Sequence, residues 1–444
     1  MTTEAILIVA GVVILFLALL AIRLHVALSL TVAGLVGTAL LRSLDAAVGT
    51  ASNAPFSVAA DYALTIIPLF ILMGILAVKA GLADAGFNLA SKLLTRLPGG
   101  TALASIAGSG LFAAVTGSSV ATVATMARIS TNAIVSAGHS IKLAAGVVSA
   151  GGTLGVLIPP SIVLVLYGVV TNESIGDLLI AGIIPGLITI AAYSIIAILV
   201  AHFEKKPDTT VLDTTNDKAE DTLTAPKLDL LGVGYLAVIF LASIGTIYLG
   251  VATPTEAASF GAIVAFIIFF LRTKPPQWLA QLKETATEAV GLTAMTFLLM
   301  AGAGVFTYFL ALSGASSALV SNVVGADFPP YLVLVLCLLL LIPLGMFLDG
   351  ISMILIAAPL LHPILTGYGF EGVWLGILIV KVAEMALITP PVGMNAFVYS
   401  GAVPEAGLVT VFKGIAPFIL ADIAVVAILI AFPELVSFLP NLTG

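Results

Sequence analysis

Charged residues are unusually scarce in this sequence. Only 9% of its 444 residues are Asp, Glu, Lys or Arg, whereas 60% are hydrophobic, and the mean hydropathy is +1.23. A water-soluble domain carries a much larger charged share, so the composition excludes one and indicates a polytopic membrane protein. The formal net charge of -7 lies largely in one loop, so it does not indicate a ligand.

Residues that form disulfides or bind metals through sulfur and nitrogen are also scarce. Cys337 is the only cysteine, which excludes a disulfide framework and a thiolate metal site. The histidines are far apart in the sequence and show no ligand spacing: they are His25, His139, His202 and His362. No Gly-rich phosphate-binding loop is present, so we do not expect ATP hydrolysis.

Ten apolar runs are long enough, or nearly long enough, to cross a bilayer. They cover residues 5–22, 26–41, 62–80, 143–170, 177–201, 230–249, 255–271, 288–312, 372–400 and 414–436. The first run follows Glu4 and lacks a small-residue cleavage site, so we expect a spanning helix rather than a removable signal. With the N-terminus outside, almost all basic residues between the runs fall at cytoplasmic ends, and only Arg42 lies clearly on the other side.

Two further apolar stretches are interrupted halfway. Residues 101–137 contain TGSS at 116–119, and residues 330–366 contain DGIS at 349–352. Each half is short for a crossing, which favours a re-entrant helical hairpin in each stretch. The alternative is a pair of ordinary short helices in each.

Two of the long runs contain helix-breaking residues. The run 143–170 holds GGTLGVLIPPS at 151–161, and the run 372–400 holds ALITPPVGMN at 386–395. Proline removes an amide donor and clashes with the preceding turn. Broken backbone at membrane depth survives only inside protein or beside a watery cavity. Two broken helices at matching places predict a transporter with its site near the midplane.

The two halves of the chain repeat the same order of elements. Pro159 and Pro390 are separated by 390 − 159 = 231 positions, and the same offset takes Ser118 to Asp349. An odd number of crossings lies between equivalent points, so the repeat is inverted in the membrane. The predicted units are scaffold helices at 1–60, a first repeat at 61–202, an acidic cytoplasmic linker at 203–229, scaffold helices at 230–285 and a second repeat at 286–444.

The hairpin tips are the first candidates for a binding site. Helices that end near the midplane leave amides and carbonyls without partners, and these can hold a carboxylate or a sodium ion. Ser118 and Ser119 add hydroxyl oxygens to the first tip, although helix capping explains them equally well. Asp349 and Ser352 serve the second tip, and an intramembrane carboxylate is by default functional.

The broken helices supply the opposite wall of the predicted site. Glycines 151, 152 and 155 allow close approach of backbone to an ion, with tight helix packing as the alternative explanation. Thr389 and Asn395 offer side-chain oxygens.

Other charged residues are weaker candidates. Lys381 and Glu384 are one helical turn apart, and we expect them to neutralise each other. Asp422 has no obvious partner. Arg128 suits either an anion contact or a clamp on backbone carbonyls.

Seven motifs, in order along nearly the whole chain, resemble the large membrane subunit (DctM type) of TRAP transporters. They are PLFILMG at 68–74, GSSVAT at 117–122, GGTLG at 151–155, IPPS at 158–161, AGIIPG at 181–186, TPTEAA at 253–258 and TPPVGMN at 389–395. The one departure is a rather long acidic linker after Phe203, which touches no motif.

The resemblance implies an all-α fold of the elevator-type ion transporters, with inverted repeats, and no enzymatic activity. It implies sodium-driven import of a small carboxylate, such as a C4-dicarboxylate or a sugar acid, across the bacterial inner membrane. The implied partners are a small four-helix membrane subunit (DctQ type) and a periplasmic substrate-binding protein (DctP type). Sodium is the coupling ion, and neither a cofactor nor nucleic acid is implied. A self-sufficient sodium–dicarboxylate carrier of the same fold is the alternative.

The resemblance also transfers site roles to positions of this sequence. The implied sodium-binding residues are Ser118, Ser119, Gly151, Gly152, Thr153, Asp349, Gly350, Ser352, Thr389, Gly393 and Asn395. The implied substrate-binding residues are Thr116, Ser118, Arg128, Pro160, Ser161, Ser352 and Asn395.

Overall fold

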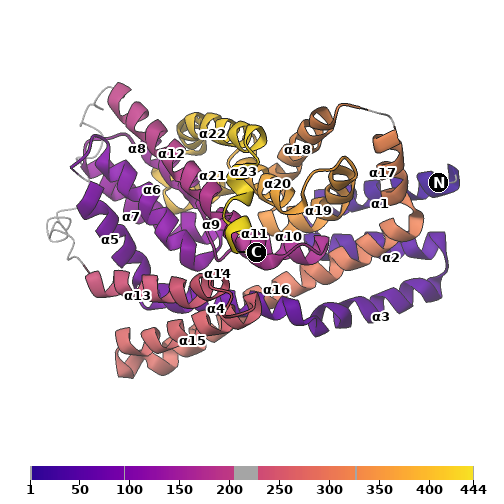
Figure 1. Ribbon diagram of the computed structural model, residues 1–444, viewed down its shortest axis with the longest axis horizontal. Coiled ribbons are helices and arrows are strands. Elements are labelled where there is room, and N and C mark those ends of the chain that lie inside the picture. Colours follow the sequence, from indigo (N-terminus) through magenta and orange to yellow (C-terminus); the bar gives the residue numbers. More distant parts are fainter. Residues whose placement is uncertain (1–2, 95, 205–228, 326–327, 444) are drawn as a thin grey trace.

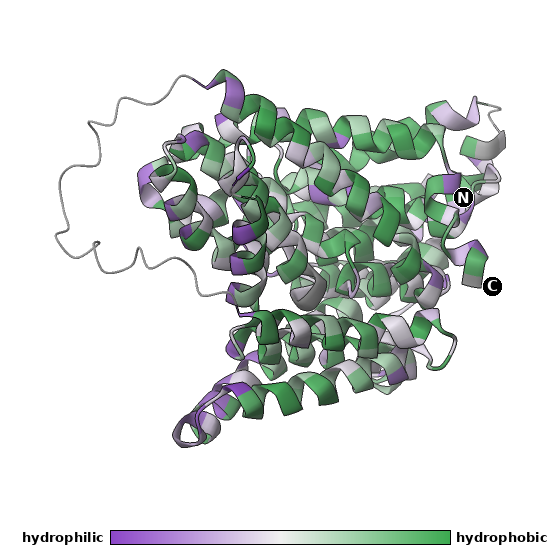
Figure 2. Ribbon diagram, turned by 60° about the vertical axis from the view of Figure 1, so that its left-hand side comes forward, coloured by the Kyte–Doolittle hydropathy of each residue, from purple (hydrophilic) through white to green (hydrophobic). Residues whose placement is uncertain are grey.

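The computed structural model describes residues 3–94, 96–204, 229–325 and 328–443. Within these ranges the chain is helical and contains no strand. Nine of the described helices are long and apolar enough to cross a bilayer, and a bent pair raises the number to ten. Figure 2 shows that the long helices are hydrophobic over most of their length. The predicted fold class, an all-α polytopic membrane protein, is therefore confirmed.

One set of helices lies along one side of the molecule (Figure 1). The set comprises α2 (Val26–Leu41), α3 (Leu44–Ala60), α13 (Leu230–Phe240), a π-helical turn (Leu241–Gly245), α14 (Thr246–Tyr248), α15 (Pro254–Arg272) and α16 (Trp278–Ser313), with α1 (Thr3–Ala21) beside α2. A capping box begins α15: Thr253 Oγ1 accepts from Glu256 N, and Thr253 N donates to Glu256 Oε2. The two helices α2 and α16 pack so closely that a methyl group at Gly34 would lie 2.9 Å from Phe306 Cα.

The first hairpin and the first broken helix follow in the order expected. The elements are η1 (Tyr62–Thr65), α4 (Ile66–Lys79), α5 (Leu82–Leu94), α6 (Gly100–Thr116), α7 (Ser119–Ser136), α8 (Ile141–Gly152), α9 (Leu154–Leu157), α10 (Ile162–Thr171), α11 (Ile175–Ala181) and α12 (Ile183–Phe203). Helices α6 and α7 pack against each other across the turn at Gly117, and α8–α9 meets α10 at 44°.

The second half repeats this order. Its elements are α17 (Ala315–Gly325), α18 (Pro330–Phe347), α19 (Gly350–Gly367), α20 (Gly372–Ala386), α21 (Met394–Ala402), α22 (Leu408–Ala431), α23 (Glu434–Ser437) and α24 (Pro440–Thr443), with a short 3₁₀ turn at Pro404–Ala406. Another short 3₁₀ turn, Pro275–Gln277, precedes α16. Helices α18 and α19 form the second hairpin, and α20 and α21 flank the second break. The peptide bonds Pro159-Pro160 and Pro390-Pro391 are both cis.

Three helices were not predicted from the apolar runs. Helix α5 is amphipathic and α17 is short, whereas α3 contains polar residues such as Asn53 together with Pro55. Hydropathy therefore could not reveal them; packing supports α3 against α2 and α16, and α5 against α6. The boundary at 285/286 falls inside the continuous helix α16, and most of the predicted acidic linker, 205–228, lies outside the described residues.

The chain re-enters the described structure at a polar anchor. Asp229 caps α13 by accepting from Gly232 N at 2.9 Å, and it forms an ion pair with Arg272. The Arg272 hydrogen bond lowers the pKa of the Asp229 carboxyl. Arg272 Nε also donates to the Ala80 carbonyl at 3.3 Å, so this residue joins the start of α13 to the ends of α15 and α4.

The two halves meet where helices α8 and α22 cross. A methyl group at Gly146 would lie 2.2 Å from the Gly414 carbonyl oxygen, and one at Gly414 would lie 2.1 Å from the Lys142 carbonyl oxygen. Only glycine allows backbone to approach backbone this closely. The crossing places the first broken helix directly against the last long helix.

Candidate functional site

The first hairpin tip lies on the first broken helix. Ser118 caps α7, because its Oγ accepts from Ala121 N at 3.4 Å. A methyl group at Gly117 would lie 2.6 Å from the Pro160 carbonyl oxygen, and one at Gly155 would lie 3.3 Å from the Ser118 carbonyl oxygen. Glycine is therefore required at Gly117, and a side chain at Gly155 would press against Ser118, so the GSS tip packs closely on the first broken helix.

The second hairpin tip is capped in the same way. Asp349 precedes α19 and accepts from Ser352 N at 3.4 Å and from Ser352 Oγ. The N-caps Ser118 and Asp349 are separated by 349 − 118 = 231 positions, which is the offset of the two Pro-Pro pairs. A methyl group at Gly350 would lie 3.9 Å from Leu387 Cδ1, at the start of the second break.

A buried carboxylate joins the two tips. Glu384, on α20, accepts a hydrogen bond from Ser119 Oγ through its Oε2 atom. Its Oε1 atom lies 3.1 Å from where a methyl group at Gly350 would be. The Glu384 side chain is only 1% exposed. Lys381 and Glu384 do not form the predicted ion pair with each other, because their helix is buried on every face and each side chain has a partner on another helix.

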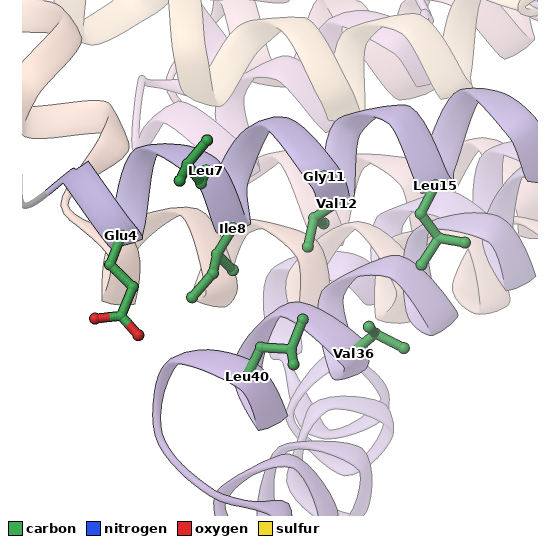
Figure 3. Close-up of a pocket in the computed structure, with 8 residues that line it drawn as sticks. All are labelled: Glu4, Leu7, Ile8, Gly11, Val12, Leu15, Val36 and Leu40. Atoms are coloured by element: carbon green, nitrogen blue, oxygen red, sulfur yellow. The ribbon is translucent and has the colours of Figure 1, made fainter.

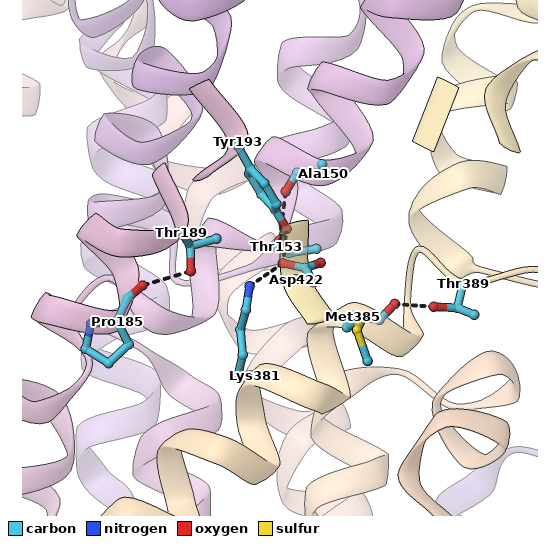
Figure 4. A network of polar contacts seen from close by, with 9 residues as sticks. All are labelled: Ala150, Thr153, Pro185, Thr189, Tyr193, Lys381, Met385, Thr389 and Asp422. Carbon is cyan, nitrogen blue, oxygen red and sulfur yellow. Dashed lines mark hydrogen bonds and ion pairs between the residues drawn. The ribbon is translucent and has the colours of Figure 1, made fainter. Parts of the chain in front are cut away.

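Lys381 instead joins a network that reaches the first broken helix (Figure 4). Its Nζ lies 2.5 Å from Asp422 Oδ1, and both side chains are at most 1% exposed. Asp422 Oδ1 also accepts from the Tyr193 hydroxyl at 2.7 Å. That hydroxyl lies 2.9 Å from Thr153 Oγ1, which donates to the Ala150 carbonyl at 2.7 Å. The network therefore fixes the C-terminal end of α8 through three other helices, α12, α20 and α22.

Asn395 closes the site from the second break. It is fully buried, and its Nδ2 donates to the Ser149 carbonyl at 3.4 Å. A methyl group at Gly152 would lie 3.4 Å from the same Nδ2 and 3.0 Å from the Ser119 carbonyl oxygen. Asn395 Oδ1 and Ser149 Oγ have no hydrogen-bond partner. Oxygen atoms from the first tip, the first break and the second break thus surround one small region.

Among the described residues, no group of three or more His, Cys, Asp and Glu side chains is arranged so that it could hold a metal ion by itself. The oxygens gathered here are carboxylate, amide, hydroxyl and carbonyl atoms, which suit a hard cation such as sodium.

The structure brings most of the sequence-predicted residues together. Gathered around the tips and the first break are Thr116, Ser118, Ser119, Gly152, Pro160, Asp349, Gly350, Ser352 and Asn395. Gly151 lies next to this group, where a methyl group would lie 2.8 Å from Ser109 Oγ.

Five predicted residues lie elsewhere or face other partners. Arg128 is exposed, and its Nε donates to the Ala402 carbonyl at 3.4 Å, which is the carbonyl contact named as one of its two roles. Thr389 donates to the Met385 carbonyl, and Gly393 caps α21 with a φ of 57°. Thr153 faces Tyr193, and Ser161 caps α10.

A match to a family model shows which protein family the chain belongs to. The model of the tripartite ATP-independent periplasmic transporter, DctM component, matches residues 13–435. This chain is a DctM component of the TRAP family.

Individual TRAP relatives agree with the family model. The chain is 33% identical over 390 residues to the C4-dicarboxylate TRAP transporter large permease protein DctM of Pseudomonas aeruginosa, covering 88% of each chain. It is 32% identical over 381 residues to the isethionate TRAP transporter permease protein DctMQ of Oleidesulfovibrio alaskensis, covering 85% of this chain and 58% of that one. The family consists of transporters rather than enzymes.

A solved structure shares the fold of this TRAP subunit. The Alcanivorax borkumensis YdaH transporter, described as having an unusual topology, superposes with a TM-score of 0.62 and covers 88% of both chains at 14% identity. At that identity the likeness concerns the fold alone.

Glu384 and Tyr193 are the main site residues of this TRAP subunit that sequence reasoning missed. The sequence predicts only that Glu384 neutralises Lys381, whereas its hydrogen-bond partner Ser119 is 265 positions away. A usable signal existed: a carboxylate within an apolar run is costly and therefore functional by default. Tyr193 offered no such signal, because tyrosine is common in apolar helices.

Proposed function

We propose that this chain is the moving subunit of a sodium-driven TRAP importer for a small carboxylate. The observation that carries the proposal is the meeting of both hairpin tips at the buried Glu384 carboxylate, with a broken helix beside each tip. Helix ends and broken backbone at membrane depth are how transporters hold ions and anionic substrates. Ser118, Ser119, Asp349, Ser352 and Asn395 supply side-chain oxygens for sodium.

Membrane energetics sets the number of ions. A dicarboxylate that enters a cell held at roughly −100 mV works against the field by about 4.6 kcal/mol, at about 2.3 kcal/mol per charge. One sodium ion would leave the load negative, and the potential would resist uptake. Two ions make the load neutral. We therefore expect at least two sodium ions per cycle, in keeping with an inverted repeat that builds similar pockets twice.

The exposed apolar helices suit a membrane partner. Only 11% of the residues in the apolar, membrane-spanning part of α1 are buried within this chain. Leu7 and Ile14 are among the exposed ones. Beside it, a groove of about 560 Å³ between α1 and α2 is lined by Glu4, Leu7, Ile8, Gly11, Val12, Leu15, Val36 and Leu40 (Figure 3). We propose that the small DctQ-type subunit binds this side, and that the hairpins and broken helices move past it as an elevator in the bacterial inner membrane.

The substrate reaches this chain through the DctP-type binding protein, which sets much of the specificity. The relatives above are named for a C4-dicarboxylate and for isethionate, both small organic anions. The compound that raises the melting temperature of the cognate binding protein identifies the substrate.

Changing Asp349 to Asn tests the sodium site. Asn is as good an N-cap as Asp, so α19 keeps its start while the tip loses one negative charge. We expect Asp349→Asn to weaken the apparent sodium affinity of uptake about tenfold, which is about 1.4 kcal/mol. The measurement is a sodium titration of uptake by the complete assembly in proteoliposomes, in which the wild type should give a Hill coefficient above one.

Asp84→Asn is the matched control, because Asp84 is exposed in the first turn of α5. It should leave the sodium titration unchanged. If Asp349→Asn also leaves it unchanged, Asp349 only caps α19. If the wild type shows no dependence on sodium, the proposed coupling is wrong.

A further inference from the structure

Glu384 lies at the beginning of two helices at once. Its Oε2 accepts from Ser119 Oγ, and its Oε1 faces Gly350. Ser119 is the first residue of α7 and Gly350 is the first residue of α19. The carboxylate therefore stands between the N-terminal ends of the second helix of each hairpin and contacts both tips.

No basic side chain pairs with this carboxylate in the part of the chain that the structure describes. The ion pairs there are Lys79–Glu284, Arg272–Asp229, His362–Glu173 and Lys381–Asp422. Lys381 is only one turn from Glu384, but its Nζ is held by Asp422 at 2.5 Å. Helix N-termini favour a negative charge, yet their contribution is smaller than the cost of removing a carboxylate from water.

The charges around the tips do not balance. Asp349, Glu384 and Asp422 are three carboxyl groups and Lys381 is one amine, so 3 − 1 = 2 carboxyl groups have no basic partner. Asp422 and Lys381 compensate each other, and Asp349 is only partly buried. Glu384 is therefore the carboxyl group without an ion pair in the most enclosed position.

We propose that Glu384 is a direct ligand of one coupling sodium ion, held between the hairpin tips. The carboxylate and the Ser119 hydroxyl supply hard oxygen atoms, which are the ligands that such cations prefer. Sodium bound here neutralises the carboxylate, and the loaded hairpin core can then cross the apolar membrane interior. This inference rests on the proposed sodium coupling and adds to it a ligand that joins both halves of the repeat.

Equilibrium binding of radiolabelled sodium tests the inference without a substrate. The purified complex of this chain with its small subunit is titrated as wild type, Glu384→Gln and Glu371→Gln. Glutamine keeps the size of the side chain and can still accept from Ser119. Glu371 is exposed and immediately precedes the same helix α20 without a side-chain capping hydrogen bond, so it serves as the control. We expect wild type and Glu371→Gln to bind at least two ions, and Glu384→Gln to bind one fewer or to need at least tenfold more sodium.

The outcomes separate this inference from the proposed function. If the wild type binds no sodium, the proposed coupling fails. If the wild type binds sodium and a monodisperse Glu384→Gln binds the same number with the same affinity, Glu384 only ties the tips together or carries a proton, and the inference is wrong. Should Glu384→Gln fail to fold, Ser119→Ala replaces it, with severalfold weaker sodium binding expected and unchanged binding as the contradiction.

Discussion

Changing Lys381 to Met should destabilise this protein more than any exposed substitution in the same chain. Asp422 would keep its charge at 0% exposure with only the Tyr193 hydroxyl as a partner. Breaking a buried ion pair by removing one partner costs about 3–5 kcal/mol. We therefore expect the melting temperature in detergent to fall by about 5–10 °C.

Two further variants make the Lys381 result specific. Lys92→Met removes an exposed lysine of α5 and should leave the melting temperature unchanged. The double variant Lys381→Met with Asp422→Asn removes both charges, keeps an acceptor for Tyr193, and should recover much of the loss, because a neutral pair needs no compensation. A single variant as stable as the wild type would mean that the Lys381–Asp422 pair is not closed in the membrane.

The second large effect is the loss of transport when the chain is alone. We expect proteoliposomes that contain only this chain to accumulate no substrate above background, whereas the complete assembly accumulates it. The physical reason is the exposed apolar surface of α1 and α3, where Leu7, Ile14 and Phe56 are exposed. Without a partner, we expect no fixed frame past which the hairpin core can move.

Three preparations check this prediction: the chain alone, the chain with its small subunit, and the complete assembly with the binding protein. Only the third should accumulate substrate. Robust sodium-driven uptake by the chain alone would instead support the self-sufficient carrier of the same fold.

Local sequence signals were sufficient for the hairpins and the breaks. Gly117 allows the turn that ends α6, and the N-caps Ser118 and Asp349 begin α7 and α19. Each of these effects depends on residues close in the sequence. The offset of 231 positions then paired the two tips correctly.

Contacts between distant elements could not be predicted in this way. The rule that side chains one turn apart interact applies to exposed helix surfaces. Helix α20 is buried on every face, so its side chains contact other helices: Lys381 pairs with Asp422 on α22, and Glu384 accepts from Ser119 on α7. Tertiary packing selected these partners over the neighbour on the same helix. Arg128 shows that a charged residue inside a predicted hairpin need not face the site. It lies on α7, is exposed, and donates to the carbonyl of Ala402, the last residue of α21.

The most direct test of sodium-driven import is uptake by the complete assembly under an imposed sodium gradient, with ATP absent and the membrane potential clamped by valinomycin. The account predicts that labelled substrate accumulates above its outside concentration only when sodium is high outside. Replacing the gradient by equal sodium on both sides should abolish the accumulation, and replacing sodium by choline should do the same. Equal accumulation in choline, or accumulation that requires ATP, would contradict the account.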